Sequence, residues 1–147
     1  MNTSISALLE RKGTAVHSIA PTLSVSDAVA EMNRHRIGAI VVLDGRRLVG
    51  IFTERDVLRR VVGANLDPRR ALVADVMSTG VLTVSPEATI EQAMNIFTEK
   101  RLRHLPVING GELVGVISIG DITRWMADSH AAEAEHLRNY ISGAVSV

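Results

Sequence analysis

The sequence contains one long internal repeat, in which the pattern of the first copy recurs 65 residues later without a gap. Four pairs of positions show the shift: Pro21 and Pro86, Gly45 and Gly110, 48–50 and 113–115, and Asp56 and Asp121. A repeat of this length that occurs only twice is not typical of a solenoid. One copy alone is near the lower size limit for an independent hydrophobic core. The repeat therefore predicts two β-α-β-β-α units that pack face to face about a pseudo-two-fold axis, in a mixed α/β (α+β) fold.

Hydrophobic periodicity and turn residues predict the elements of both copies. A short amphipathic helix over 4–12, with Ile5, Leu8 and Leu9 on one side, precedes the first copy. The first copy is expected to contain a strand at 16–19, a helix capped by Ser24, strands at 37–43 and 48–53 around an Asp44-Gly45 turn, and helices at 55–62 and 72–77. The second is expected to contain a helix capped by Thr89, strands at 104–108 and 113–118 around Asn109-Gly110, and a last helix from about 119 through Trp125 to Tyr140.

One seven-residue motif occurs at the same place in both copies. Residues 50–56 read GIFTERD and residues 115–121 read GVISIGD. A hydroxyl residue closes the strand, and an aspartate follows three positions later at the start of a helical stretch: Thr53 and Asp56, Ser118 and Asp121. This is the spacing of a helix capping box, so each pair could serve only to start a helix. A hydroxyl and a carboxylate side by side also suit the two vicinal hydroxyls of a ribose, and the second copy in the same register favours that interpretation.

Composition excludes several classes of function. The 16 basic and 16 acidic residues cancel, so no long-range field is available to attract nucleic acid or an acidic membrane. No cysteine is present, which excludes disulfides and thiolate metal sites. The histidines lack metal-ligand spacing, and no nucleophile is paired with a base, so neither a metal site nor an enzyme is predicted. No signal peptide or transmembrane stretch is recognisable, and a cytoplasmic location is expected.

Taken together, these motifs resemble the tandem CBS-domain pair, also called a Bateman module, and in particular its small stand-alone bacterial members. The resemblance covers roughly 13–127. It depends on the doubled G-h-h-[ST]-x-x-D motif, the strand RHLPV at 103–107, the two hairpin turns and the DVM segment at 75–77. It implies a single module over 1–147, with one repeat at 13–63, a connection at 64–77, a second repeat at 78–128 and a helical extension and tail at 129–147.

In that family, such pairs bind adenine nucleotides in the cleft between the repeats and regulate another protein, usually without catalysis. The resemblance implies AMP as ligand, with ATP or NAD(H) as alternatives. It assigns ribose to Thr53, Asp56, Ser118 and Asp121, adenine to Ser18, Leu23, Ile37, Gly38, Thr83, Ala88 and Leu102, and phosphate to Arg103 and His104. The first copy has Gly38 and Ala39 where the second has Arg103 and His104. Its phosphate ligand would therefore have to be Arg55 or Arg36, and two unequal sites are predicted.

Several alternatives stay open at this point. Arg103 either binds phosphate or is simply solvated, and His104 either binds phosphate or packs at the edge of its strand. The leading functional hypothesis is a regulatory, signal-transduction module that senses adenosine ligands for an unidentified regulated protein. The alternative is a protein-interaction scaffold whose nucleotide sites are vestigial. In either case we expect a homodimer, with the partner covered by Ile5, Leu8, Leu9, Trp125 and Tyr140.

Overall fold

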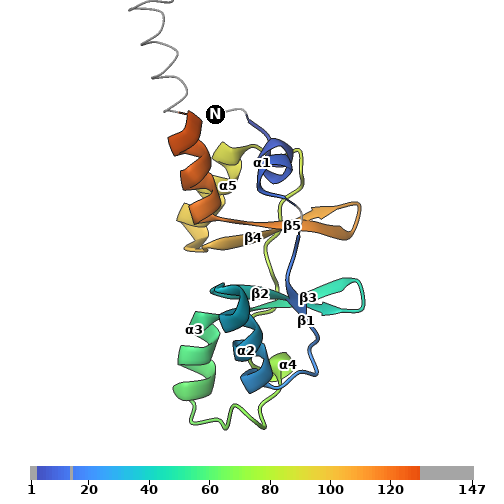
Figure 1. Cartoon of the computed structure of the whole chain (residues 1–147), viewed down its shortest axis with the longest axis vertical. Helices are drawn as coiled ribbons and strands as arrows, with labels where there is room; N and C mark the ends of the chain where they lie inside the picture. Colours follow the sequence, from blue (N-terminus) through green and yellow to red (C-terminus); the bar gives the residue numbers. More distant parts are fainter. Residues whose placement is uncertain (1–2, 14, 130–147) are drawn as a thin grey trace, which may run out of the picture.

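The chain folds into two similar α/β halves stacked one above the other, each with its own sheet and helices (Figure 1). This computed structural model describes residues 3–13 and 15–129. The first half contains β1 (Ser18–Ile19), α2 (Val25–His35), β2 (Ala39–Asp44), β3 (Arg47–Thr53), α3 (Glu54–Asp56), the π-helix η1 (Val57–Val62) and α4 (Val73–Val76). The second contains α1 (Ile5–Lys12), α5 (Ile90–Lys100), β4 (His104–Asn109), β5 (Glu112–Ser118) and a helix that begins at residue 119 and is described to residue 129. The predicted fold class and the two repeats are confirmed.

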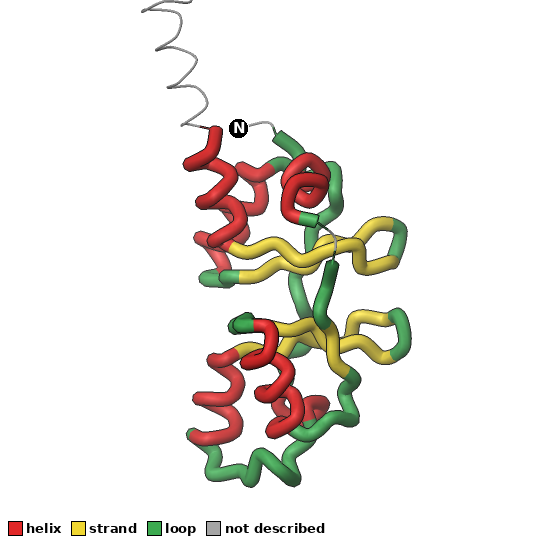
Figure 2. Tube along the Cα trace, in the orientation of Figure 1, coloured by secondary structure: helices red, strands yellow, loops and turns green. Residues whose placement is uncertain are grey.

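The two sheets repeat the same hydrogen-bonding register. In the first half, β1 is parallel to β2, with Ile19 opposite Val42, and β2 is antiparallel to β3. In the second, β4 is antiparallel to β5, and an isolated parallel bridge joins Val84 to Val107 at the corresponding place. In both hairpins the pairing register shifts after the equivalent residue, which is Val42 in the first half and Val107 in the second. Both hairpins also project from the same side of the molecule (Figure 2).

Each half is completed by a helix that lies outside its own β-α-β-β segment. α1 packs on the second half, where the Ile5 amide donates to the Ala88 carbonyl at 2.8 Å. α4 packs on the first half, where the Val73 amide donates to the Leu23 carbonyl at 2.9 Å. The chain therefore passes from the second half to the first between α1 and β1, and returns to the second half through 77–83 after α4 (Figure 2). These crossings join the two halves into one module.

The packing of α1 corrects one prediction. Ile5, Leu8 and Leu9 are only 0%, 2% and 5% exposed, in one hydrophobic cluster with the core of the second half. These three side chains are therefore buried within the chain and are not available to contact a second copy. Their amphipathic spacing correctly indicated a buried face, but the surface they cover is the second repeat. Tyr140 lies outside the described residues.

The helix after the first motif also differs from its prediction. A regular helix was expected over 55–62, but the chain winds as α3 and then as the wider η1, in which the Gly63 amide donates to the Leu58 carbonyl, five residues back. A Cβ at Gly63 would lie 2.7 Å from the Arg59 carbonyl oxygen, so a side chain at this widened end would force the backbone to shift. The corresponding position in the second copy is Asp128, and there the helix from 119 is regular.

No helix within 3–13 and 15–129 is long and apolar enough to cross a membrane.

Candidate functional site

The first hydroxyl–carboxylate corner is a complete capping box at the junction of β3 and α3. Oδ2 of Asp56 accepts hydrogen bonds from the Thr53 amide at 3.0 Å and from the Thr53 hydroxyl at 3.1 Å. The Asp56 amide in turn lies 3.2 Å from the Thr53 hydroxyl. The predicted capping role is therefore confirmed for this pair.

The other oxygen of Asp56 is also occupied. Oδ1 accepts a hydrogen bond from the Ser78 hydroxyl at 2.9 Å and lies 3.7 Å from Nε of Arg60. Arg60 also donates to the Met77 carbonyl at 2.9 Å, so it joins the helix to the connection after α4. The side chain of Asp56 is only 6% exposed. A ribose could reach this carboxylate only by displacing Ser78.

The second corner has the same capping box with a more accessible carboxylate. The Ser118 amide donates to Oδ2 of Asp121 at 2.8 Å, and the Asp121 amide donates to the Ser118 hydroxyl at 3.1 Å. Nζ of Lys12, from the end of α1, donates to the same Oδ2 at 2.6 Å. Oδ1 accepts no hydrogen bond from the described residues, and because no described buried side-chain oxygen lacks a partner, it is accessible. The Asp121 side chain is 16% exposed.

The start of β4 lies beside this second corner. His104 pairs with Ser118 in the β4–β5 register, and the Ile119 amide donates to the Arg103 carbonyl at 3.0 Å. Arg103, His104 and the Ser118–Asp121 pair therefore come together, as the resemblance implied. Burial, and after it the Lys12 ammonium, lowers the pKa of the His104 imidazole, so the ring is neutral at pH 7.

An acidic residue of the first repeat also acts on this corner. Glu54, at the start of α3, is close enough to raise the pKa of His104 slightly, against the larger effects of burial and Lys12. The Glu54 carboxylate lies 3.1 Å from where a Cβ of Gly38 would be, and its amide donates to the Gly38 carbonyl at 3.0 Å. The carboxylate of Glu54 therefore lies close to Gly38, whose assignment to adenine stays a prediction.

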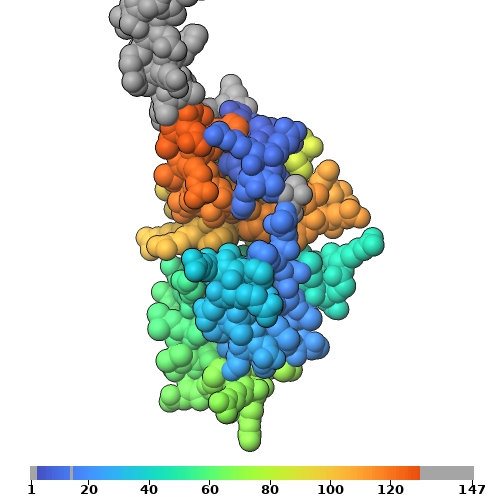
Figure 3. Space-filling model, viewed as in Figure 1, coloured from blue at the N-terminus to red at the C-terminus, as the bar shows by residue number. Residues whose placement is uncertain are grey.

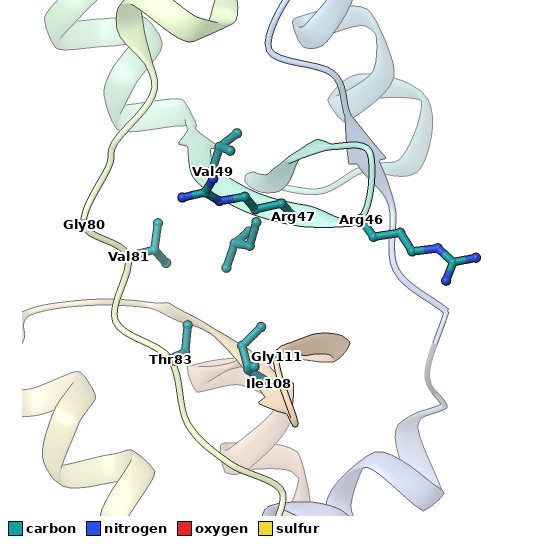
Figure 4. A pocket seen from close by; sticks show the side chains of 9 residues that line it. Arg46, Arg47, Val49, Gly80, Val81, Thr83, Ile108 and Gly111 are labelled. Carbon is teal, nitrogen blue, oxygen red and sulfur yellow. The ribbon is translucent and has the colours of Figure 1, made fainter.

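A cavity of about 580 Å³ lies between the two repeats, bounded by both hairpins and the 80–83 segment. Its lining is mainly apolar, and of the predicted adenine residues it includes Thr83. Figure 4 shows Arg47 extending along β3 toward this segment, whereas Arg46 points away from the cavity. The repeated motifs point to neither arginine. The available signal was the difference between the two hairpin turns, which read DGRR in the first copy and NGGE in the second.

The other predicted site residues are distributed as follows. Leu23 and Ile37 pack against the core of the first half, and Ala88 and Leu102 against the core of the second. Ser18 is exposed in β1, and Arg55 is exposed on α3. Arg36 is exposed at the left-handed end of α2, with φ of 55°. Among the described residues, no side chain forms a hydrogen bond or ion pair with either arginine, and their assignment to phosphate stays a prediction. Lys12, which contacts Asp121, was not predicted as a site residue.

The stacked repeats, the cavity between them and the doubled corner define a module built from two α/β repeats. Residues 13–63 and 73–128 match the CBS domain family, and the chain belongs to that family. It is 34% identical over 151 residues to the mitochondrial CBS domain-containing protein CBSX3 of Arabidopsis thaliana, which covers 97% of this chain and 73% of that protein.

Two solved structures extend the comparison. The CBS-domain containing protein ATU1752 from Agrobacterium tumefaciens is 38% identical, with a TM-score of 0.80 over 84% of this chain and 99% of that chain. The CBS domain protein PAE2072 from Pyrobaculum aerophilum, solved in complex with AMP, is 29% identical, with a TM-score of 0.72 over 80% of this chain and 88% of that chain. The chain is thus similar along most of its length to small proteins made of CBS domains.

Proposed function

We propose that this chain is a non-catalytic regulatory module that binds an adenosine-containing ligand at two unequal sites, with the stronger site in the second repeat. The observation that carries the proposal is the contrast between the two aspartates. Asp121 retains an accessible oxygen, whereas both oxygens of Asp56 are occupied within the chain. The complex of the similar PAE2072 protein with AMP supports AMP as the first ligand to test, with ATP and NAD(H) as alternatives.

In the proposed second site, ribose hydroxyls donate to Asp121 while Ser118 keeps the carboxylate in place. Thr83, Ala88 and Leu102 contact the adenine, as the family resemblance implies. Arg103 provides charge for the phosphate, because its side chain is exposed and has no ion-pair partner among the described residues. His104 provides a hydrogen bond rather than a charge, because its lowered pKa keeps the ring neutral.

In the proposed first site, Thr53 and Asp56 would play the ribose roles, with Ser18, Leu23, Ile37 and Gly38 near the adenine. Binding there would have to break the 2.9 Å hydrogen bond from Ser78 to Asp56. It would also bring the phosphate near Glu54, which lies against Gly38. Both effects oppose an anionic ligand, so the first site is expected to be the weaker one.

A thermal-shift screen followed by titration calorimetry tests this proposal. The screen would contain AMP, ADP, ATP, NAD(H) and S-adenosylmethionine, and the best ligand would then be titrated. We expect one clear binding event with AMP, and a second only at higher concentration. Two equal sites, or no stabilisation by any adenosine compound, would contradict the proposal.

A dimeric protein-interaction scaffold is the second candidate, and a surface of η1 favours it. Leu58 and Val62 lie one helical turn apart and are 66% and 63% exposed. The corresponding residues of the second copy, Thr123 and Ala127, are polar or small. We propose that the homodimer uses this surface in place of the α1 residues. Light scattering should give a dimer mass for the natural chain and a monomer mass for Leu58→Glu, with Thr123→Glu as the matched control. A monomer at micromolar concentration for the natural chain would remove the dimer.

A further inference from the structure

Lys12 lies just outside the repeated pattern, yet its side chain reaches the second corner. The match to the CBS family begins at residue 13, so the family motif assigns no role to this residue. Its position is fixed by α1, whose Ile5, Leu8 and Leu9 are buried in the second half. α1 lies beside the helix that starts at 119 (Figure 3), and Arg11 donates to Asp128 there at 2.7 Å.

The ammonium of Lys12 is held by two acceptors and keeps one free donor. It donates to Oδ2 of Asp121 at 2.6 Å and to the Val116 carbonyl. An ammonium group has three N–H donors, and no third acceptor is present among the described residues. The Lys12 side chain is 36% exposed. It can therefore stay near Asp121 and still present a hydrogen and a positive charge to a bound molecule.

In the first repeat, Ser78 occupies the position that corresponds to the Lys12 ammonium. There the Ser78 amide donates to the Ile51 carbonyl at 2.9 Å, and Ile51 corresponds to Val116 in the repeat. The Ser78 hydroxyl meets Asp56, as the Lys12 ammonium meets Asp121. The neutral hydroxyl of Ser78, on a hydrogen-bonded main chain, thus corresponds to the flexible ammonium of Lys12. Only the second site therefore has a positive charge at this position.

The charges around the second corner decide what this cation does. Lys12 and Arg103 are positive and Asp121 and Glu54 are negative, and these four groups act on the neutral ring of His104. Arg11, Arg124 and Asp128 also line the cavity beside Lys12 and Asp121, and Arg11 is paired with Asp128. Lys12 is therefore one of the positive charges at this corner, and removing it makes the corner less favourable for a phosphate close by.

We propose that Lys12 is a specificity-determining residue of the second site, which attracts the phosphate of a nucleotide while Asp121 holds the ribose. The proposal rests on the function proposed above and adds to it a preference for nucleotide over nucleoside. Because the cation comes from α1, that preference depends on a segment that precedes both repeats.

The test compares AMP with adenosine, which differ by the phosphate alone. Titration calorimetry would use the natural chain, Lys12→Gln and Lys100→Gln. The chain contains only two lysines, Lys12 and Lys100, and Lys100 is exposed at the end of α5, so the second variant is a matched control for loss of charge. A hydrogen bond to a charged group corresponds to roughly tenfold in affinity at its lower limit.

We expect Lys12→Gln to weaken AMP about tenfold and adenosine less than about threefold, while Lys100→Gln changes neither. Lys12→Arg should restore most of the preference, and thermal melting of each unliganded variant checks that it is folded. Equal weakening of both ligands would mean that Lys12 only positions Asp121, and tighter binding of both would mean that it competes with the ribose. Either result overturns the inference but leaves the proposed function intact. If neither ligand binds the natural chain, the proposed function fails and this inference fails with it.

Discussion

The two hydroxyl–carboxylate corners share a motif, a register and a capping box. They differ in which residues outside the motif bind the carboxylate oxygens. At the first corner, Ser78 and Arg60 occupy the oxygen of Asp56 that Thr53 leaves free. At the second, Lys12 shares Oδ2 of Asp121 with the Ser118 amide and leaves Oδ1 accessible. The motif therefore determines where the carboxylate lies, and residues outside the motif determine whether its oxygens are accessible.

The difference arises from the two helices that complete the repeats. α4 is short and is separated by one residue from Ser78, whose main chain pairs with β3 at Ile51. α1 runs further, to Lys12, and a side chain takes the place of that pairing. A main-chain pairing is difficult to displace, whereas a partly exposed lysine can move at little energetic cost. We therefore expect the first corner to be mainly structural and the second to be the ligand site.

The largest expected effect is on stability, and it distinguishes Gly50 in β3, beside Ser78, from Gly115 in β5, beside α1. A Cβ at Gly50 would lie 2.9 Å from the main-chain oxygen of Ser78, while a Cβ at Gly115 would meet only the end of the Leu9 side chain, at 2.8 Å. Overpacking costs about 1–3 kcal/mol. We expect Gly50→Ala to lose about 3 kcal/mol of unfolding free energy and Gly115→Ala about 1 kcal/mol, measured by urea denaturation. Equal losses of unfolding free energy would contradict the difference drawn between the main chain at Ser78 and the side chain of Leu9.

A smaller effect is expected on opening the first corner. Ser78→Ala removes the hydroxyl from Asp56 and leaves the pairing of Ser78 with Ile51 in place. Because the acceptor is a charged carboxylate, losing this hydrogen bond should reduce the unfolding free energy by roughly 1.5 kcal/mol. The freed oxygen should also strengthen the weaker AMP binding event in calorimetry. Thr79→Ala, at the exposed neighbouring position, is the control and should change neither. If Ser78→Ala leaves AMP binding unchanged, Ser78 is not what closes the first site.

The smallest expected effect is the pH response due to His104, which has no counterpart in the first copy because Ala39 takes its place there. Burial first, and Lys12 second, lower the pKa of His104 from 6.5. As the pH falls below 6.5, the unfolded chain takes up a proton at this position before the folded chain does. Stability should therefore fall with pH from there down to the folded pKa.

His104→Gln should remove that part of the pH dependence, measured by urea denaturation at pH 7.5 and 5.5. The other histidines are common to both proteins and cancel in the comparison. A phosphate beside His104 should also favour its protonated form, so AMP binding near pH 6 should take up protons in the natural chain and fewer in the variant. Identical pH profiles for the two proteins would contradict the environment assigned to His104.

Local features of the fold could be predicted from the sequence because they depend on residues close in the chain. The capping boxes join residues three positions apart, and the hairpin turns contain the expected glycines at positive φ, Gly45 and Gly110. The two repeats followed from the 65-residue shift. The widened η1 ends at Gly63, where the second copy has Asp128. Only a comparison of these two positions could have indicated that the two helices differ.

The partners of the two aspartates could not be predicted in this way. Ser78 is 22 positions from Asp56, and Lys12 is 109 positions from Asp121. The apolar face of α1 indicated burial, but periodicity does not say against which surface a helix packs. The assignments of ribose, adenine and phosphate residues stay predictions, and the structure adds Lys12, Glu54 and Arg47 to the residues that have to be tested.

AMP titration of the Asp121→Ala and Asp56→Ala variants tests most directly whether ribose is bound at the second corner. Hydrogen bonds to a charged acceptor contribute about 1.5–3 kcal/mol, so Asp121→Ala should weaken the main AMP binding event about ten- to a hundredfold. The melting temperature of the unliganded variant should change little, because removing a carboxylate from a helix start costs only about 0.5–1 kcal/mol. Asp56→Ala should lower the melting temperature further and leave the main AMP affinity within about threefold of the natural chain. Unchanged AMP affinity in Asp121→Ala, or loss of the main event in Asp56→Ala, would contradict the assignment.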